Sequence, residues 1–215
     1  MSHTMTALSA ALPLVSGWSV HSLWMRRRIE AARRDPLSGL LTRGSFTERA
    51  ERWLGHRPRA VCLIDLNKFK QINDTYGHAA GDAVIRAAGE RLSEWALNNS
   101  AVVGRLGGDE FAAVAPACSQ DQLTETLNSL IAGLEQQVEA GGHVLTVSAS
   151  IGAAVFNPRA DQADLSKLLR LADEQMYKAK QRGGGWCIAH PLAVPAMRTV
   201  NGRRDGRRGT SGEAA

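Results

Sequence analysis

Apolar residues recur along the chain with two different periods, which predict alternating strands and helices. Residues 60–66 form a nearly continuous apolar run that ends in an acidic residue, as expected of a buried central strand. Residues 144–156 alternate in part and are rich in β-branched residues, and residues 186–188 form a short apolar run, so both are expected to be strands. Helical spacing of the apolar residues predicts helices at 46–54, 79–97, 121–139 and 165–180.

A pair of glycines between two of these helices predicts a hairpin. Residues 102–103 and 111–114 are short apolar strands, and Gly107-Gly108 between them suits a tight turn, because glycine adopts positive φ without steric cost. Strands and helices in alternation, with at least one hairpin, predict an α/β (α+β) fold in which helices flank a central sheet.

The N-terminal segment, residues 1–34, has a pattern of its own. Residues 5–25 carry no charged side chain and would just span a bilayer, although a proline and four serines dilute their hydrophobicity. Three arginines at 26–28 follow at once, as on the cytoplasmic side of a membrane span. Two interpretations stay open: membrane contact through residues 5–28, with anchoring at the inner face of the cell membrane, or a helix that packs on a partner or a second copy.

A helix over residues 20–34 is expected to run into the domain and to break at Pro36. Asp35 is then expected to cap the start of a following helix, with Pro36 in its first turn.

Length and charge divide the chain further. Its 215 residues suit one domain, residues 35–190, followed by a basic tail, residues 191–215, whose composition predicts disorder. The net charge of +5 belongs to the flanks: residues 26–34 carry +4 and the tail +3, which leaves about −2 for residues 35–190. A mildly acidic domain argues against nucleic-acid binding, and only the arginine-rich flanks favour it.

The three cysteines, Cys62, Cys118 and Cys187, are too few and too widely spaced for a disulfide framework or a zinc site. Cys62 lies in the apolar run and is expected to be a buried thiol. The cysteines fit the reducing cytoplasm, which is where the domain is expected to work.

Acidic residues stand at the two places where chemistry is expected. Asp109 and Glu110 follow the glycine pair, and Asp65 closes the strand 60–66. Carboxylates beside exposed backbone suit a metal ion and a phosphate, although a surface hairpin with solvated acids would have the same pattern. Residues 67–82 add a basic and polar loop, dense in groups that read a base or hold a phosphate.

Four blocks of sequence resemble the GGDEF-domain family, whose active members are diguanylate cyclases. The blocks are residues 35–40 with Arg43, residues 65–82, the signature 107–111 and residues 172–180, and together they span residues 35 to about 190. The resemblance implies a central mixed, largely antiparallel sheet of about five strands, similar to nucleotidyl cyclase and polymerase-palm folds. It also implies condensation of two GTP molecules into cyclic di-GMP by a homodimer.

The resemblance assigns roles to the acidic residues. Asp65, Asp109 and Glu110 match metal-binding carboxylates, helped by the backbone carbonyl of Leu66, for a cofactor that would be Mg²⁺ or Mn²⁺. Asp109 also matches the residue that activates the 3′-hydroxyl, and Lys70 matches a residue that offsets charge near the phosphates.

Substrate-binding roles follow in the same way. The family reads guanine with the residues that match Asn73 and Asp82, and it places residues matching Phe69, His78 and Lys180 near the nucleotide. A carboxylate accepts both N–H groups on one edge of guanine, and an amide reads the neighbouring groups. The glycines Gly107 and Gly108 would let the nucleotide approach the turn.

Two departures from the family pattern bear on activity. Where the family has Gly-Arg-Asn after the matching lysine, this chain has Gly183-Gly184-Gly185, so Arg182 is the candidate to supply the missing phosphate-binding arginine. The Arg-x-x-Asp product-inhibition motif is replaced by residues 98–101, Asn-Asn-Ser-Ala, so no product inhibition is expected there. A catalytically weak domain that binds GTP as a receptor or scaffold is therefore the alternative to an active cyclase.

Overall fold

The computed structural model describes residues 30–55, 57–160 and 162–189, together with residues 18, 21, 22, 24, 25 and 28. The predicted disordered tail and most of the N-terminal segment lie outside these residues. The elements are, in order, β1 (Leu41–Thr42), α2 (Arg43–Leu54), β2 (Arg59–Leu66), α3 (Phe69–Tyr76), α4 (His78–Asn98), β3 (Val102–Gly107), β4 (Glu110–Pro116), α5 (Gln120–Leu134), β5 (Val138–Ala140), β6 (His143–Leu145), β7 (Ala149–Phe156), α6 (Leu165–Gln181) and β8 (Gly185–Ala189).

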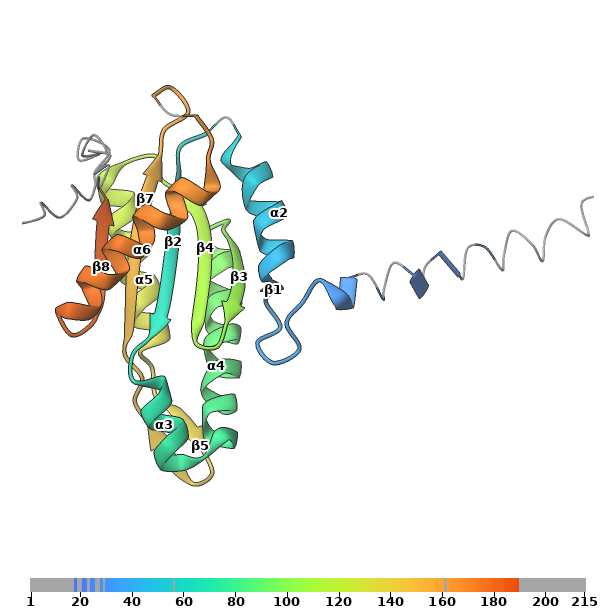
Figure 1. Ribbon diagram of the computed structural model, residues 1–215, viewed down its shortest axis with the longest axis vertical. Coiled ribbons are helices and arrows are strands. Elements are labelled where there is room, and N and C mark those ends of the chain that lie inside the picture. Colours follow the sequence, from blue (N-terminus) through green and yellow to red (C-terminus); the bar gives the residue numbers. More distant parts are fainter. Residues whose placement is uncertain are drawn as a thin grey trace, which may run out of the picture.

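A six-stranded sheet with the order β1-β3-β4-β2-β7-β8 forms the centre of the domain (Figure 1). The pairs β3–β4, β4–β2 and β2–β7 are antiparallel, whereas the outer pairs β1–β3 and β7–β8 are parallel. The predicted mixed, largely antiparallel sheet is thus confirmed, with one strand more than expected. That strand, β1, has two residues, too few to show a period in the sequence.

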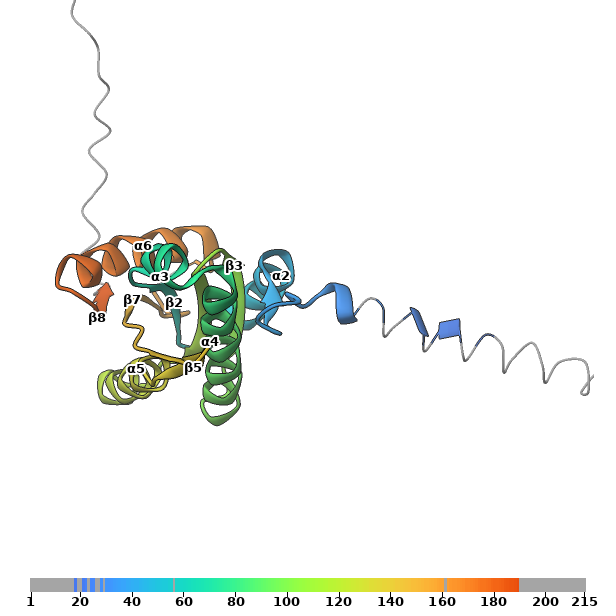
Figure 2. The ribbon, with the colours of Figure 1, turned by 90° about the horizontal axis from the view of Figure 1, so that it is seen from below.

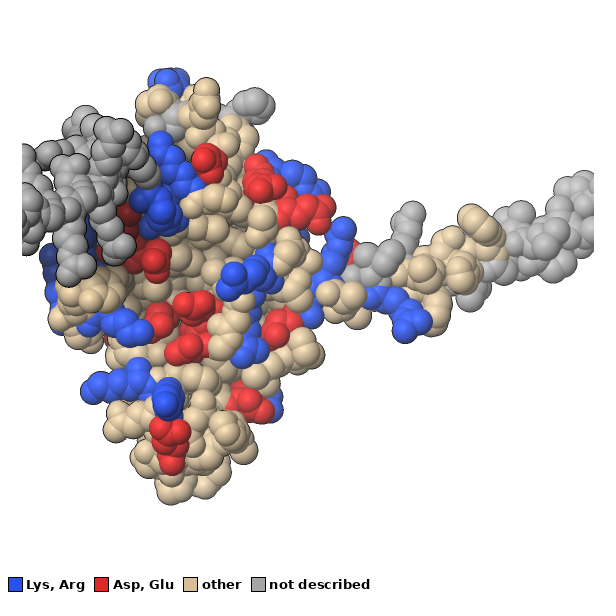
Figure 3. Space-filling view, viewed as in Figure 1, with Lys and Arg blue, Asp and Glu red and all other residues tan. Residues whose placement is uncertain are grey.

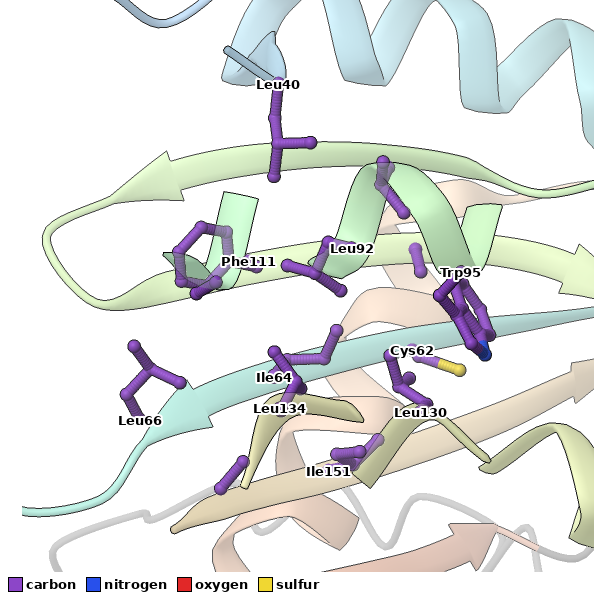
Figure 4. Close-up of a cluster of buried hydrophobic side chains, with 14 of the residues drawn as sticks. Leu40, Cys62, Ile64, Leu66, Leu92, Trp95, Phe111, Leu130, Leu134 and Ile151 are labelled. Carbon is purple, nitrogen blue, oxygen red and sulfur yellow. The ribbon is translucent and has the colours of Figure 1, made fainter. Parts of the chain in front are cut away.

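Helices cover both faces of the sheet. Viewed from below, α4 and α5 lie on one side, and α2 and α6 lie on the other (Figure 2). The strand period of two sends alternate side chains of β2 into two cores. Cys62 and Ile64 join the cluster under α4 and α5, where Leu92 and Trp95 also lie (Figure 4), whereas Val61 joins the cluster under α2 and α6. Each fully buried leucine or phenylalanine contributes about 1.5–3 kcal/mol to folding.

The predicted helix at 121–139 is too long at its C-terminal end. Helix α5 ends at Leu134, and Val138–Ala140 form β5, which pairs with β6 in a separate two-stranded sheet. The guanidinium of Arg91, on α4, donates hydrogen bonds to the carbonyls of Leu134, Gln136 and Gln137 at 2.8–3.2 Å. These contacts satisfy carbonyls at the end of α5 and just beyond it, and they stabilise the chain where it leaves the helix.

Two other predictions about local structure are wrong. Asp35 does not cap a helix: residues 36–38 form a turn, and the Asp35 Oδ1 accepts hydrogen bonds from the Ser38 N–H and Oγ, both at 2.8 Å. Residues 69–76 are the helix α3, although the sequence indicated a polar loop. Only Ile72 of α3 is buried, so its apolar stripe was too thin to read as a helix.

Near the N-terminus, residues 30–32 are helical and Arg33 is in a turn, so the described end of the expected helix stops before Pro36. No helix in the described part of the chain combines the length and the apolarity needed to span a membrane.

Candidate active site

The C-terminal end of β2 carries the first acidic residue of the site. Because alternate residues face opposite sides, Ile64 enters the core under α4 and Asp65 faces the side of α6. Asp65 is only 7% exposed, and its Oδ1 accepts a hydrogen bond of 2.8 Å from the Nζ of Lys180, near the end of α6. Sequence-distant residues thus meet through the packing of α6 on β2 and β7.

The hairpin between β3 and β4 brings the other acids to the same place. Gly107 and Gly108 adopt positive φ values of 149° and 52°, which favour glycine. Glu110 lies directly opposite Asp65 in the antiparallel register, and the Leu66 N–H donates to the Asp109 carbonyl at 3.3 Å. The structure therefore gathers the four predicted metal-site positions, Asp65, Leu66, Asp109 and Glu110, at neighbouring strand ends.

Negative charge is concentrated there. Burial raises the pKa of the Asp109 carboxyl above its usual value, and the Asp65 charge raises it further, against the lowering effects of a hydrogen bond from its own backbone and of Lys180 and Arg105. Figure 3, on the face that α6 covers, shows acidic side chains near the middle with basic side chains on either side. Such a group of carboxylates attracts a cation.

Arg105 lies in β3, two residues before the signature, and the sequence alone assigns it no role. Its guanidinium donates two hydrogen bonds to the Gly108 carbonyl, at 2.7 and 3.0 Å, and one of 2.9 Å to Asp35 Oδ1. Although burial raises the pKa of Asp35, the hydrogen bonds from Arg105 and Ser38 outweigh it and hold that pKa below its usual value. Arg105 therefore ties the glycine turn to the linker that enters the domain.

The candidate guanine-binding residues lie on α3 and α4, directly after the acidic end of β2. Phe69 and Asn73 of α3 both lie against Gly81 of α4. Asp82 follows Gly81 and forms a long ion pair of 3.8 Å with Arg86, in which both side chains are half-exposed. The two predicted guanine readers, Asn73 and Asp82, thus flank one glycine.

Lys70 and His78 are both exposed. His78 is the first residue of α4, and Lys70 lies in the first turn of α3. Their predicted roles toward phosphate and substrate stay predictions.

The predicted substitute arginine, Arg182, is directed elsewhere in this structure. It is the C-cap of α6, and its Nη1 donates to the Sγ of Cys187 at 3.4 Å. Gly184, where the family has arginine, has a φ of +128°, and a Cβ there would lie 3.1 Å from the Ala149 carbonyl oxygen and 3.2 Å from Asn67 Nδ2. A side chain at position 184 would therefore require this backbone to change.

Asn67 is a second residue that the sequence analysis passed over. Its Nδ2 donates to Ser148 Oγ at 3.2 Å, and its Oδ1 accepts from Ser150 Oγ at 2.8 Å. These bonds attach the segment after Leu66 to β7 and to the residues before it. They hold the chain that carries the Leu66 carbonyl in place.

The donor set fits a hard divalent cation that is completed by its substrate. Among the described residues, no three acidic, histidine or cysteine side chains lie close enough to hold a metal by themselves. Mg²⁺ is usually bound by one or two carboxylates together with water and substrate phosphates, so Asp65, Asp109 and a backbone carbonyl suffice. The repulsion between Asp65 and Asp109 is the feature that a cation would relieve.

The comparisons with known proteins agree with this site. The sequence profile described as "Diguanylate cyclase, GGDEF domain" matches residues 32–185, and the chain belongs to this family. An uncharacterized 19.3 kDa protein of Streptomyces ambofaciens is 43% identical over 172 residues, which are 80% of this chain and 90% of that protein. Diguanylate cyclase DosC of Escherichia coli K12 is 35% identical over 156 residues, 69% of this chain, but this match spans only 33% of DosC.

Solved structures share the fold. The GGDEF domain of TpbB (YfiN) from Pseudomonas aeruginosa has a TM-score of 0.66 and 34% identity, and the match covers 73% of this chain and 94% of that one. The coiled coil and GGDEF domain of DgcB from Caulobacter crescentus, solved in complex with c-di-GMP, has a TM-score of 0.71, covering 86% and 98% of the two chains. At 23% identity, the second likeness speaks for the fold alone.

Proposed function

We propose that this chain is a diguanylate cyclase, which condenses two GTP molecules into cyclic di-GMP and two pyrophosphates. The observation that carries the proposal is the meeting of Asp65, Asp109 and Glu110 at two neighbouring strand ends, beside Lys180. Phosphoryl transfer depends on positioning and on neutralising charge, and this arrangement offers both a candidate cation site and a nearby ammonium group.

Asp65, Asp109, Glu110 and the Leu66 carbonyl would hold Mg²⁺ or Mn²⁺, which offsets the negative charge of the triphosphate when it is bound. The ammonium group of Lys180 donates to Asp65 Oδ1 at 2.8 Å. The Lys180 side chain is half-exposed and long enough to turn toward a bound triphosphate.

Asp109 takes the proton in this mechanism. The 3′-oxygen of one GTP attacks the α-phosphorus of the other, and its proton passes to the Asp109 carboxylate. The bond from the α-phosphorus to its bridging oxygen then breaks, and pyrophosphate leaves; a second equivalent step closes the ring.

The remaining residues bind and orient the nucleotide. Asn73 and Asp82 read the guanine, Phe69 and His78 line its surroundings, and Lys70 offsets charge at the phosphates. The backbone of Gly107 and Gly108 lets the nucleotide approach the turn.

Catalysis requires two copies of the domain, since one set of guanine readers holds one GTP and each 3′-hydroxyl must reach the other α-phosphate. The N-terminal segment is the candidate for pairing the two copies in the cytoplasm. Because Asn98-Asn99-Ser100-Ala101 lacks both charges of the product-inhibition motif, no product inhibition through this segment is expected.

A second function, a GTP-binding receptor or scaffold with little turnover, is favoured by one observation. Arg182 contacts Cys187, and Gly184 has no side chain, so the described part of the chain presents no arginine at the family's phosphate-binding position. Guanidinium binds phosphate in a bidentate manner that the lysines do not reproduce.

One experiment separates the two functions. Purified protein is incubated with GTP and Mg²⁺ at a series of protein concentrations, with Asp109→Ala as the control, and the products are separated and identified. An active cyclase forms cyclic di-GMP in the wild type only, with a specific activity that rises with protein concentration as dimers form. GTP binding without product at the highest concentration would instead establish the receptor.

A further inference from the structure

Helices α3 and α4 follow each other with a sharp reversal between them. Gly77 joins them with a φ of 81°, and its N–H donates to the Asn73 carbonyl at 2.9 Å. The reversal lays the last turn of α3 against the first turn of α4. Asn73, on α3, therefore lies beside Gly81, which is buried on α4.

The missing side chain of Gly81 leaves the space that Asn73 occupies. A Cβ on Gly81 would overlap Asn73 Oδ1 and would lie 2.9 Å from Asn73 Cγ, closer than real Cβ contacts. The same Cβ would lie 3.1 Å from the Cζ of Phe69. Gly81 thus forms a notch that holds the ends of two side chains of the candidate nucleotide site.

The amide of Asn73 is held by this packing alone. Within the part of the chain that the structure describes, its side chain makes no hydrogen bond, and the residue is only partly buried. An amide that packing orients, and that no protein group occupies, keeps its donor and acceptor for a ligand. Asp82, the next residue after the notch, presents its carboxylate beside it.

We infer that Gly81 is a positioning residue that sets guanine selectivity by holding the Asn73 amide in its reading orientation. This inference rests on the proposed use of GTP. It differs from a packing role, because the group that a methyl at position 81 would displace is the end of the flexible Asn73 side chain, whereas the Phe69 ring would need to shift by only a few tenths of an ångström. Asn73 can rotate away at little cost to the fold, and alanine is favoured over glycine within a helix.

The test is the Gly81→Ala variant, with Gly133→Ala as its matched control. Gly133 lies within α5, and a Cβ there would meet nothing within 4 Å. Binding is measured by calorimetry with Mg²⁺ and α,β-methylene-GTP, whose bridging carbon prevents loss of pyrophosphate, and with the adenine analogue. Thermal unfolding of each variant is recorded in parallel.

We expect Gly81→Ala to weaken binding of the guanine analogue about 10-fold or more, since an amide that reads a base contributes one to two hydrogen bonds. Binding of the adenine analogue should change less than about threefold, and the unfolding temperature should hold or rise. Gly133→Ala should bind as the wild type does. In an Asn73→Ala background, adding Gly81→Ala should change guanine binding less than about twofold, because the group it displaces is already gone.

The inference would be overturned if Gly81→Ala bound the guanine analogue as the wild type does, or if it lost affinity equally for both analogues. It would also be overturned if the loss of affinity accompanied a lowered unfolding temperature. A full additional loss of affinity for the guanine analogue in the Asn73→Ala background would contradict the inference. A wild type that does not prefer the guanine analogue would overturn it as well. The fate of the proposed function is decided separately, by whether the same wild-type sample forms cyclic di-GMP from GTP.

Discussion

Replacing Arg105 with alanine should destabilise the domain by about 2–3 kcal/mol at pH 7. The largest part comes from the ion pair with Asp35, in which the two side chains are only 14% and 22% exposed and the atoms lie 2.9 Å apart. A hydrogen bond between charged groups contributes about 1.5–3 kcal/mol, and partial exposure places this one near the lower end. The Gly108 carbonyl is exposed and becomes hydrated, so its two lost bonds add about 0.5–1 kcal/mol.

The pH dependence of this loss has a defined sign. The pKa of Asp35 is lowered in the folded state, so its ionised form stabilises the fold above the ordinary value of 3.8, and that stability is lost as the pH falls through the folded pKa. Without Arg105, its hydrogen bond and its charge no longer lower the pKa of Asp35, so this pKa rises toward or above its ordinary value. The difference in unfolding free energy between wild type and variant should therefore shrink as the pH falls below about 4.

Urea unfolding followed by tryptophan fluorescence at pH 7, 4.5 and 3 measures this difference. Arg170→Ala is the matched control, because Arg170 forms an equally short ion pair with Glu174, at 2.8 Å, but both side chains are half-exposed. The Arg170→Ala variant should lose less than about 0.5 kcal/mol of unfolding free energy. A loss of that small size for Arg105→Ala at pH 7, or a loss that is the same at all three pH values, would refute the reasoning.

Three other substitutions have defined outcomes. Asp109→Asn should abolish product formation and should raise the unfolding free energy at pH 7. The stability gain is expected because the pKa of Asp109 is raised in the folded state, so that its ionisation opposes folding. Urea unfolding should show that this gain vanishes when the pH falls below the ordinary pKa of aspartate. Lys68→Gly should raise the free energy of unfolding by about 0.5–1 kcal/mol in the same assay. Lys68 has a φ of 59°, a left-handed conformation that glycine adopts without steric cost. Gly152→Ala should lower the free energy of unfolding by more than about 2 kcal/mol, because its Cβ would overlap the Ala172 carbonyl of α6. Gly133→Ala, the control, should leave this free energy unchanged or raise it. Equal unfolding midpoints for the two variants would contradict the packing described.

Long, strongly periodic elements could be predicted from the sequence. The helix over 79–97 and the strand over 60–66 match α4 and β2 closely, because each has a wide apolar surface to bury. Helix α3 buries only Ile72 and was missed. Helix α5 ends earlier than expected, where a distant side chain, that of Arg91, donates hydrogen bonds to the carbonyls of Leu134, Gln136 and Gln137. Local periodicity carries no information about such a contact.

The acidic part of the site was predictable for a different reason. Asp65, Asp109 and Glu110 stand in ordered motifs, so a resemblance identifies them before any contact is known. The contacts of Arg105 and of Arg182 are not encoded in a motif. Arg105 reaches a residue 70 positions away, and Arg182 faces a thiol, so both had to be seen in three dimensions.

Strand β2 is paired on both sides, with β4 from Arg59 to Asp65 and with β7 from Arg59 to Leu66, and it places Asp65 near its C-terminal end. Its amide protons are therefore expected to exchange with solvent only when the entire domain unfolds. The glycine turn that carries Asp109 belongs to a hairpin nearer the edge of the sheet and is open to solvent. The site thus combines a strand whose amides exchange slowly with a turn whose amides exchange quickly. A ligand that bridges Asp65 and Asp109 would slow amide exchange in the turn far more than in the strand.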